Sequence, residues 1–414
     1  MPARGLLLLP FLLTPIVSFQ FRMLNATIAP DLVAEFGLGP AELGLITSAF
    51  FIGFAAAQLP MGLLLDRYGP RPVVVSLQLI GAAGGAVFMT ADGQAGLLAG
   101  RALIGVGMAG SVMAGLKAAN LWFDRARLPA IGALLFGMTG VGGMLATGPL
   151  AVLLKSIDWR TAMVGICLFC CVIAVVAYRL IPDAPRPATR QRLLPQIAEI
   201  GRLYASGVFL RYAPATVTVI ASYTSYQSLW TAIWLRDMEG YGREAQAWAL
   251  FALMAAMMLG NFALGALNAP LQRHGVLTLT VALTAMCGMV ALEAGIAAGL
   301  APASLPVWAA VGFLSSGPIA MFAIVSSRFP VEIAGRCSTA LNLLGFFGGF
   351  LIQSGVGVVL DRFPVAADGR YDPVGHRTAL GLIVALQVAG LAWFFLARGL
   401  DRPAPHATER KDRP

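Results

Sequence analysis

Twelve long apolar runs divide this chain, and they constrain its fold more than any other feature. Each run holds about 20 residues, which is the length that a helix rising about 1.5 Å per residue needs to cross a hydrocarbon core. Only 12% of the residues are charged, against about 25% in soluble domains. We therefore expect an all-α polytopic membrane protein. The runs extend approximately over 6–29, 42–65, 72–90, 96–118, 130–154, 161–180, 208–235, 245–267, 276–299, 304–327, 337–360 and 378–398.

The basic residues are distributed unevenly among the connecting segments. With a cytoplasmic amino terminus, the cytoplasmic segments hold 19 of the 29 Lys and Arg, and the outer segments hold 7. Cytoplasmic loops of membrane proteins carry such an excess, so both termini are predicted to be cytoplasmic. The net charge of +9 comes from residues scattered at the ends of apolar runs, without a basic stripe. This pattern indicates a lipid bilayer as the surrounding partner and no nucleic acid.

The longest polar interruption, residues 181–207, separates the runs into two sets of six. The two halves also share sequence features, since Arg67-Tyr-Gly is echoed by Arg273-His-Gly, 206 residues later. Internal repeats of this kind are typical of transporters that rock two bundles against each other. The predicted domains are an amino-terminal bundle (1–180), a cytoplasmic linker (181–207), a carboxy-terminal bundle (208–398) and a cytoplasmic tail (399–414).

A charged segment, Gly62-Leu-Leu-Leu-Asp-Arg-Tyr-Gly-Pro-Arg71, lies between the second and third runs. The loop there is short, and Gly69 followed by Pro70 suits a reversal of chain direction. With Arg101 near the start of the fourth run, these features make the chain resemble the major facilitator superfamily over essentially its whole length. That family carries G-x-x-x-D-R-x-G-R-[RK] at this place, matched here by Gly62, Asp66, Arg67, Gly69 and Arg71, with Pro70 in place of the usual arginine.

The resemblance implies two six-helix bundles and transport by alternating access. It also implies that the Gly62–Arg71 motif is a gate, with Asp66 close to the amino end of the eleventh helix, near Cys337, Ser338 and Thr339. The run Gly105-x-Gly107-x-x-Gly110 follows no strand, so it is interpreted as a smooth helix face for close packing rather than a dinucleotide site. Gly148-Pro149 resembles part of an antiporter signature, but the flanking glycines of that signature are absent.

Arg22 lies deep within the first apolar run, and a buried guanidinium needs a partner. In the resembling family the first, fourth, seventh and tenth helices line a central cavity, so Arg22 is a candidate for binding an anionic substrate. Two alternatives remain open: backbone carbonyls, or Asp31 and Glu35 nearer the outer surface, could satisfy it. The remaining predicted cavity residues are Asn25, Arg101, Tyr223, Tyr226, Gln227, Trp230 and Asn342.

Three carboxylates are candidates for carrying a coupling proton: Glu293, which lies within the ninth run, and Asp31 and Glu35. An ionisable group inside a membrane marks an ion pathway in many transporters. Glu293 lies near the outer end of its run, so a solvated position is the competing interpretation. His376 is placed in a loop, because the twelfth run is predicted to begin at residue 378. We expect no metal, no cofactor and no nucleotide-binding loop.

These patterns predict a secondary transporter, not an enzyme. The leading hypothesis is proton-coupled uptake of a small organic anion, amino acid or peptide by a monomer in a bacterial inner membrane. The alternative is a proton-coupled efflux antiporter for drugs or metabolites, which requires a carboxylate in the cavity. A membrane sensor or scaffold is disfavoured, because no large soluble segment follows the last run.

Overall fold

The structure is a computed structural model that describes residues 4–124, 127–183, 193–300 and 304–401, and it is almost entirely helical. The helices of the first half are α1 (Arg4–Phe36), α2 (Pro40–Tyr68), α3 (Pro70–Met89), α4 (Gln94–Met108), α5 (Ser111–Trp122), α6 (Leu128–Leu145), α7 (Gly148–Leu153) and α8 (Trp159–Leu180). Helix α9 (Leu193–Tyr204) lies in the segment between the halves. The second half contains α10 (Gly207–Ser225), the π-helix η2 (Tyr226–Trp230), α11 (Thr231–Glu239), α12 (Arg243–Arg273), α13 (Thr278–Ala297), α14 (Leu305–Leu314), α15 (Ser316–Ser326), α16 (Val331–Leu360), α17 (Pro373–Leu396) and the short 3₁₀ helix η3 (Ala397–Leu400).

The predicted membrane spans are confirmed. Eleven helices of the described chain are long and apolar enough to cross a membrane. The segment Gly207–Glu239, seventh along the chain, brings the number of spans to twelve, and it makes an 80° bend with the preceding segment Ala198–Tyr204. Three predicted spans are each divided into two α-helices by a short break. The break before α7 falls at Ala146 and Thr147, directly before Gly148-Pro149, where proline lacks the backbone N–H that would continue the hydrogen-bond ladder.

The loop between α2 and α3 is as short as the sequence indicates. Helix α2 ends at Tyr68, α3 begins at Pro70, and Gly69 alone joins them with φ +78°. This conformation costs glycine little, because it has no Cβ to clash with the neighbouring carbonyl. The charged residues of the motif are therefore held at one end of the first bundle.

The glycines of α4 allow close helix packing, which confirms the interpretation of the Gly105-x-Gly107-x-x-Gly110 run. A Cβ placed on Gly105 would lie 2.1 Å from the Phe50 carbonyl oxygen of α2. One placed on Gly107 would lie 2.3 Å from the Gly81 nitrogen of α3. Backbones approach this closely only where no side chain intervenes. Helix α4 is therefore fixed against α2 and α3.

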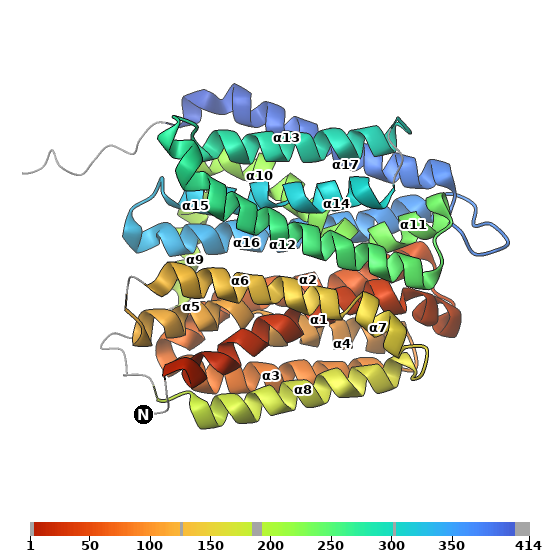
Figure 1. The fold of residues 1–414 in the computed structure, drawn as a ribbon, viewed down its shortest axis with the longest axis horizontal. Coiled ribbons are helices and arrows are strands. Elements are labelled where there is room, and N and C mark those ends of the chain that lie inside the picture. Colours follow the sequence, from red (N-terminus) through yellow and green to blue (C-terminus); the bar gives the residue numbers. More distant parts are fainter. Residues whose placement is uncertain (1–3, 125–126, 184–192, 301–303, 402–414) are drawn as a thin grey trace, which may run out of the picture.

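The helices form two bundles that lie against each other, as Figure 1 shows with the first half in red to yellow and the second half in green to blue. We call the interface between them the seam. Helix α1 begins, and α17 ends, at the same end of the molecule. Helix α2 packs along α16, and α6 and α7 pack along α12. The substrate path of a two-bundle transporter runs along such a seam.

The seam is closely packed at the end opposite the termini. There Arg243 of α12 donates to Asp31 of α1 at 2.9 Å, and Lys155 donates to Glu244 at 2.6 Å. A Cβ placed on Gly357 would lie 2.4 Å from the Pro40 carbonyl oxygen. Toward the other end, α9 joins the bundles through an ion pair between Glu199 and Arg336 of α16. The contacts that hold the bundles directly together thus include two ion pairs at the end away from the termini.

Candidate functional site

Arg22 lies in the middle of α1 and faces the second bundle across the seam. Its side chain is buried, and its Nη2 donates a hydrogen bond to Gln227 Oε1 of η2 at 3.4 Å. The guanidinium carbon lies 5.0 to 5.6 Å from the ring centroids of Phe19, Phe51 and Phe346. Phe346 belongs to the second bundle, so aromatic faces from both sides of the seam contact the cation.

Among the described residues, no carboxylate forms an ion pair with Arg22. Asp31 pairs with Arg243, and Glu35 accepts from Arg160 Nη1 at 2.7 Å. The alternative in which these carboxylates satisfy Arg22 is therefore wrong. Arg22 Nε is buried without a hydrogen-bond partner, although a guanidinium carries five donors. This unused hydrogen-bonding capacity favours an anion as the missing partner.

Gln227 is positioned by an irregular segment of the seventh span. Tyr226–Trp230 form one turn of π-helix between α10 and α11. Such turns are rare in proteins and occur frequently at functional sites. Gln227 Oε1 faces Arg22, while its Nε2 lies 3.1 Å from Met254 Sδ and 3.4 Å from Met257 Sδ. The π-turn thus presents an amide to the buried cation.

Some of the other predicted cavity residues lie at or near the seam, and others pack within one bundle. Trp230 lies at the seam, because a Cβ placed on Gly44 of α2 would lie 3.1 Å from its ring, and its Nε1 donates to the Gln353 carbonyl at 3.1 Å within the second bundle. Asn25 Nδ2 donates to Thr47 Oγ1 at 3.0 Å within the first bundle. Tyr223 is also buried, and its hydroxyl has no hydrogen-bond partner among the described residues. Tyr226 stacks on Trp308 of α14, with ring centroids 5.6 Å apart. Tyr226 therefore packs within the second bundle.

Arg101 and Asn342 are less closely associated with this site. Arg101 Nη1 donates to the Phe21 carbonyl of α1 at 2.7 Å, and its guanidinium carbon lies 5.4 Å from the Phe50 ring centroid. It therefore ties α4 to α1 directly beside Arg22. Asn342 is only partly buried in α16. Of the predicted cavity residues, the structure brings Arg22 and Gln227 into a direct hydrogen bond across the seam.

Glu293 is enclosed inside the second bundle, and the interpretation that water solvates it is wrong. Its side chain is fully buried between three helices. Gln387 Nε2 of α17 donates to its carboxylate at 2.7 Å, and Ser222 Oγ of α10 lies 3.4 Å and 3.5 Å from the two oxygens. The recorded partners are uncharged. Ser222 lies in the same span as Gln227, so the carboxyl group contacts the helix that carries the seam residues.

The motif residues lie at the terminus-bearing end of the first bundle. Asp66 accepts a hydrogen bond from Lys117 Nζ of α5 at 2.7 Å. Arg71 Nη1 donates to Asp183 at 2.9 Å, and the Arg67 guanidinium carbon lies 5.1 Å from the Tyr68 ring centroid. The expected contact of Asp66 with Cys337, Ser338 and Thr339 is not among the contacts of the described residues. In this arrangement Asp66 pairs within its own bundle.

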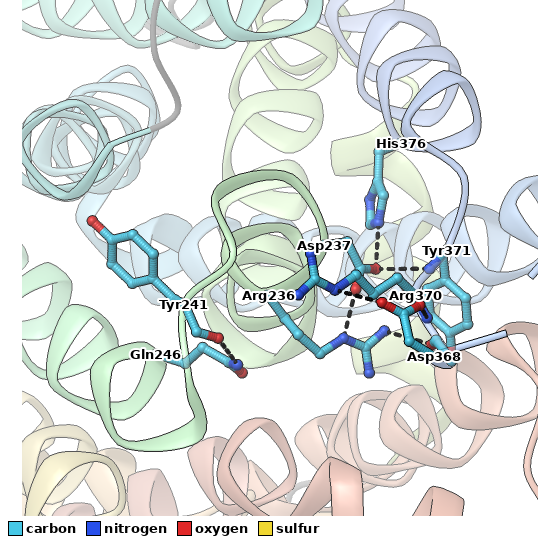
Figure 2. A network of polar contacts seen from close by, with 9 residues as sticks. Arg236, Asp237, Tyr241, Gln246, Asp368, Arg370, Tyr371 and His376 are labelled. Atoms are coloured by element: carbon cyan, nitrogen blue, oxygen red, sulfur yellow. Dashed lines mark hydrogen bonds and ion pairs between the residues drawn. The ribbon is translucent and has the colours of Figure 1, made fainter. Parts of the chain in front are cut away.

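Sequence reasoning missed a buried ion-pair network at the end opposite the termini, which Figure 2 shows. Asp237 of α11 accepts from Arg236 Nε and from the Tyr371 backbone N–H at 3.2 Å, and it lies 2.8 Å from His376 Nε2. The Asp237 and His376 side chains are 0% and 2% exposed. The placement of His376 in a loop is wrong, because α17 begins at Pro373. A histidine three residues after a helix-starting proline was the available signal.

The architecture defined so far, two helical bundles with a buried cation at the seam between them, is that of a membrane transporter. The family model of the Major Facilitator Superfamily matches residues 11–353. The chain belongs to this family, whose members are transporters rather than enzymes.

Several named relatives are transporters of small molecules. The chain is 26% identical over 422 residues to the probable nitrate/nitrite transporter NarK2 of Mycobacterium tuberculosis, covering 95% of this chain and 96% of that protein. It is 24% identical over 386 residues to a probable 4-methylmuconolactone transporter of Cupriavidus pinatubonensis, covering 91% and 88%. It is 25% identical over 222 residues to the probable sulfoacetate transporter SauU of Cupriavidus necator, covering 53% of this chain and 49% of that protein.

Solved structures of the same fold include a bacterial homologue of the human lysosomal transporter Spinster in an inward-facing, occupied conformation. That chain has a TM-score of 0.75 and 17% identity, with 98% of this chain and 99% of that chain covered. A D-xylose–proton symporter gives a TM-score of 0.74 at 12% identity, covering 97% and 99%. These likenesses establish the two-domain transporter fold.

The Asp237 network is expected to fix α11 to the connection between α16 and α17. Replacing Asp237 with Ala should reduce the free energy of unfolding by about 3–5 kcal/mol, because it leaves buried donors without their acceptor. A double-mutant cycle with His376→Ala should give a coupling of about 0.5–3 kcal/mol. Denaturant unfolding in detergent measures both quantities.

A matched control is Asp368→Ala, which removes an exposed partner of Arg370. It should change the free energy of unfolding by less than about 0.5 kcal/mol. Additive effects of Asp237→Ala and His376→Ala would contradict a direct coupling between the two side chains.

Proposed function

We propose that this protein carries a small organic anion across the membrane, in symport with protons, and that Arg22 binds the anionic group. Secondary transport by alternating access is the activity of the family to which the chain belongs. The proposal that the substrate is an anion rests on one observation: Arg22 is buried at the seam without a carboxylate partner among the described residues. A carboxylate supplied by the substrate would complete its hydrogen bonds.

The position of Arg22 suits a substrate site for a second reason. Its hydrogen bond to Gln227 and its contact with Phe346 both cross the seam. A ligand bound there would contact both bundles, and it could favour one arrangement of them over another through differences in those contacts. A cation tied only to its own bundle would have no such influence.

The relatives' names include several that denote anions: nitrate and nitrite, sulfoacetate and hexuronate. They support an anionic substrate without selecting one.

The efflux antiporter alternative requires a carboxylate at the seam. Among the described residues, the side chains that contact Arg22 are instead phenylalanines and Gln227. We therefore favour uptake of an anion over export of cationic compounds.

Arg22→Ala should weaken binding of the transported anion by about 10- to 100-fold, because a hydrogen bond to a charged group contributes about 1.5–3 kcal/mol. Arg22→Lys should retain part of the affinity, since it keeps the charge without the planar donor pair. Thermal-shift titration of the purified protein with lactate, gluconate, sulfoacetate and nitrate measures binding, and proteoliposome uptake measures transport.

Arg160→Gln is the control, because it removes an arginine of the same bundle that pairs with Glu35 far from the site. It should leave binding unchanged. If Arg22→Ala bound and carried a confirmed anionic substrate normally, the assignment of Arg22 would be abandoned.

Proton coupling is proposed to depend on Glu293. This carboxyl group is fully buried and its recorded partners, Ser222 and Gln387, are uncharged. Burial of an unpaired carboxylate is costly, whereas a carboxylic acid can be enclosed with its hydrogen bonds satisfied. Loss and gain of a proton at this position would alter the contacts between α10, α13 and α17. Asp31 and Glu35 are weaker candidates, because each already pairs with an arginine.

Glu293→Gln should abolish accumulation of substrate driven by a pH gradient and leave exchange of substrate across the membrane intact. The glutamine preserves the shape and hydrogen bonds of a protonated carboxyl group but cannot release a proton. Uptake and counterflow assays in the same proteoliposomes separate the two activities. Glu239→Gln, at an exposed carboxylate at the end of α11, is the control. Gradient-driven accumulation by Glu293→Gln at the normal rate would refute the coupling role.

We propose that the motif at Gly62, Asp66, Arg67, Gly69 and Arg71 is a gate at the terminus-bearing end. Asp66 is half-exposed there and bonded to Lys117. A carboxylate at this position could exchange that partner for the free N–H groups at the start of α16 when the two bundles close at this end. The exchange would favour the closed arrangement.

Asp66→Asn should slow transport by about tenfold and change substrate affinity less than about twofold, because coupling energies of this kind are typically 1–3 kcal/mol. Initial uptake rates and thermal-shift affinities measure the two quantities. Asp368→Asn, which removes the exposed partner of Arg370 at the opposite end of the molecule, is the matched control. Unchanged turnover in Asp66→Asn would contradict the gate.

We further propose that both termini face the cytoplasm of a bacterial inner membrane, which makes the motif the cytoplasmic gate. The excess of basic residues in the segments at that end supports this orientation. Protease accessibility of a carboxy-terminal tag in intact cells, compared with inside-out vesicles, tests it. Cleavage in intact cells would reverse the assignment.

A further inference from the structure

Uncharged polar side chains line the seam one to two helical turns beyond Arg22, toward the end opposite the termini: Asn25 follows Arg22 by three residues in α1, and Gln353 follows Phe346, which contacts Arg22, by seven residues in α16. We call this group the polar layer. All but Ser354 are buried. The layer consists of Asn25, Thr47 and Ser48 from the first bundle and Ser228, Gln353 and Ser354 from the second.

The polar layer lies at the seam. Ser48 and Ser354 hydroxyls from opposite bundles are 2.7 Å apart. A Cβ placed on Gly44 would lie 2.9 Å from the Gln353 carbonyl oxygen. Thr47 is three residues from Gly44 and four from Phe51, so it shares their face of α2. Asn25, which bonds to Thr47, therefore borders the same interface.

Asn25 leaves a hydrogen-bond acceptor unused. Its Oδ1 is buried and has no partner among the described residues. Thr47 Oγ1 donates its one hydrogen to the Leu43 carbonyl at 2.8 Å, so it accepts from Asn25 Nδ2 at 3.0 Å. The orientation of the Asn25 amide is therefore fixed by Thr47. The free group is an acceptor, and only a donor can satisfy it.

Gln353 leaves a donor unused on the other side. The Ser228 hydroxyl carries one hydrogen and lies 3.1 Å from Gln353 Oε1 and 3.3 Å from the Ser225 carbonyl oxygen, so the shorter contact makes Gln353 Oε1 its acceptor. Gln353 Nε2 is buried without a partner among the described residues. Buried polar groups in folded proteins are almost always paired. An acceptor from one bundle and a donor from the other thus have no hydrogen-bond partner among the described residues, and a hydroxyl group can serve both.

We propose that the polar layer binds a hydroxyl group of the substrate, so that the transported anion is a hydroxylated carboxylate rather than a simple oxyanion. The inference rests on the proposed binding of an anion by Arg22. A substrate whose carboxylate meets Arg22 would place a hydroxyl on a nearby carbon against Asn25 and Gln353. Arg22 and Asn25 are three residues apart, which separates their Cβ atoms by about 5–6 Å. A short carbon chain spans that interval.

The proposal discriminates between kinds of anion. Nitrate and unsubstituted carboxylates have acceptor oxygens but no donor, so they cannot satisfy Asn25 Oδ1. A site with polar groups meant for a substrate hydroxyl rejects an analogue lacking it, because the site's own groups then stay unpaired. A hydroxyl group bound by both bundles would also make the movement of one bundle against the other depend on the substrate.

The test compares matched ligands on the full-length protein purified in detergent. Lactate is compared with propionate, and 3-hydroxybutyrate with butyrate, while gluconate and nitrate extend the series. The hydroxylated member of each pair should bind about tenfold more tightly or better, as expected for hydrogen bonds to buried groups. Isothermal titration and thermal shift give the affinities.

Two variants locate the effect. Asn25→Leu and Gln353→Met should each reduce the preference for the hydroxylated ligand at least severalfold and leave propionate binding within about twofold, since the carboxylate contact is retained. They come from opposite bundles, so one remains informative if the other does not fold. Gln58→Leu is the control, because Gln58 is also buried with an unpartnered Oε1 but bonds within the first bundle. It should keep the preference.

The outcomes separate this inference from the proposed function. Equal Arg22-dependent binding of lactate and propionate, or nitrate binding as tightly as the best hydroxy acid, would overturn the hydroxyl site and leave anion transport standing. A preference that persists in both Asn25→Leu and Gln353→Met would place the hydroxyl elsewhere and overturn it as well. Binding of every anion without dependence on Arg22 would instead refute the anion site itself, and the hydroxyl site with it.

Discussion

The buried charge of Arg22 is the constraint on which the rest of the central seam depends. A guanidinium in the interior of a membrane protein is costly unless hydrogen bonds and charge surround it. Here three aromatic rings and one amide contact it, and one of its nitrogens has no partner among the described residues. The nearby carboxylates Asp31 and Glu35 are instead paired with arginines. The charge of Arg22 is thus only partly stabilised by the protein, so a bound anion would add hydrogen bonds and a compensating charge.

Much of the fold could be predicted from the sequence, because membrane spans depend on local composition. Apolar runs of about 20 residues, a Gly-Pro reversal and a glycine face in α4 each act over one or two helical turns. The contacts of the site could not be predicted in the same way. Arg22 meets Gln227 across 205 residues of chain, and Gln387 reaches Glu293 across 94. Such partners are fixed by how the helices pack, which single-sequence patterns do not encode.

The solvated interpretation of Glu293 and the loop placement of His376 fail for a common physical reason. Both residues lie near the ends of apolar runs, where the sequence favours contact with water. In the structure Ser222 and Gln387 enclose Glu293, and Asp237 with the Tyr371 backbone encloses His376. Polar residues on neighbouring spans therefore allow an ionisable group to be buried close to a membrane surface. Burial at a helix end depends on those neighbours more than on depth along the helix.

The seventh span connects these separate sites. Its α10 segment carries Ser222 beside Glu293, its π-turn carries Gln227 beside Arg22, and its α11 segment carries Asp237, which is bonded to the connection before α17. A π-turn inserts an extra residue into the pattern of backbone hydrogen bonds, so α10 and α11 need not continue one regular α-helix. Fixing α11 at its far end would then confine any change that begins at Glu293 to the middle of the span. The middle is where Gln227 meets the buried cation, so a proton and an anion could influence each other through one helix.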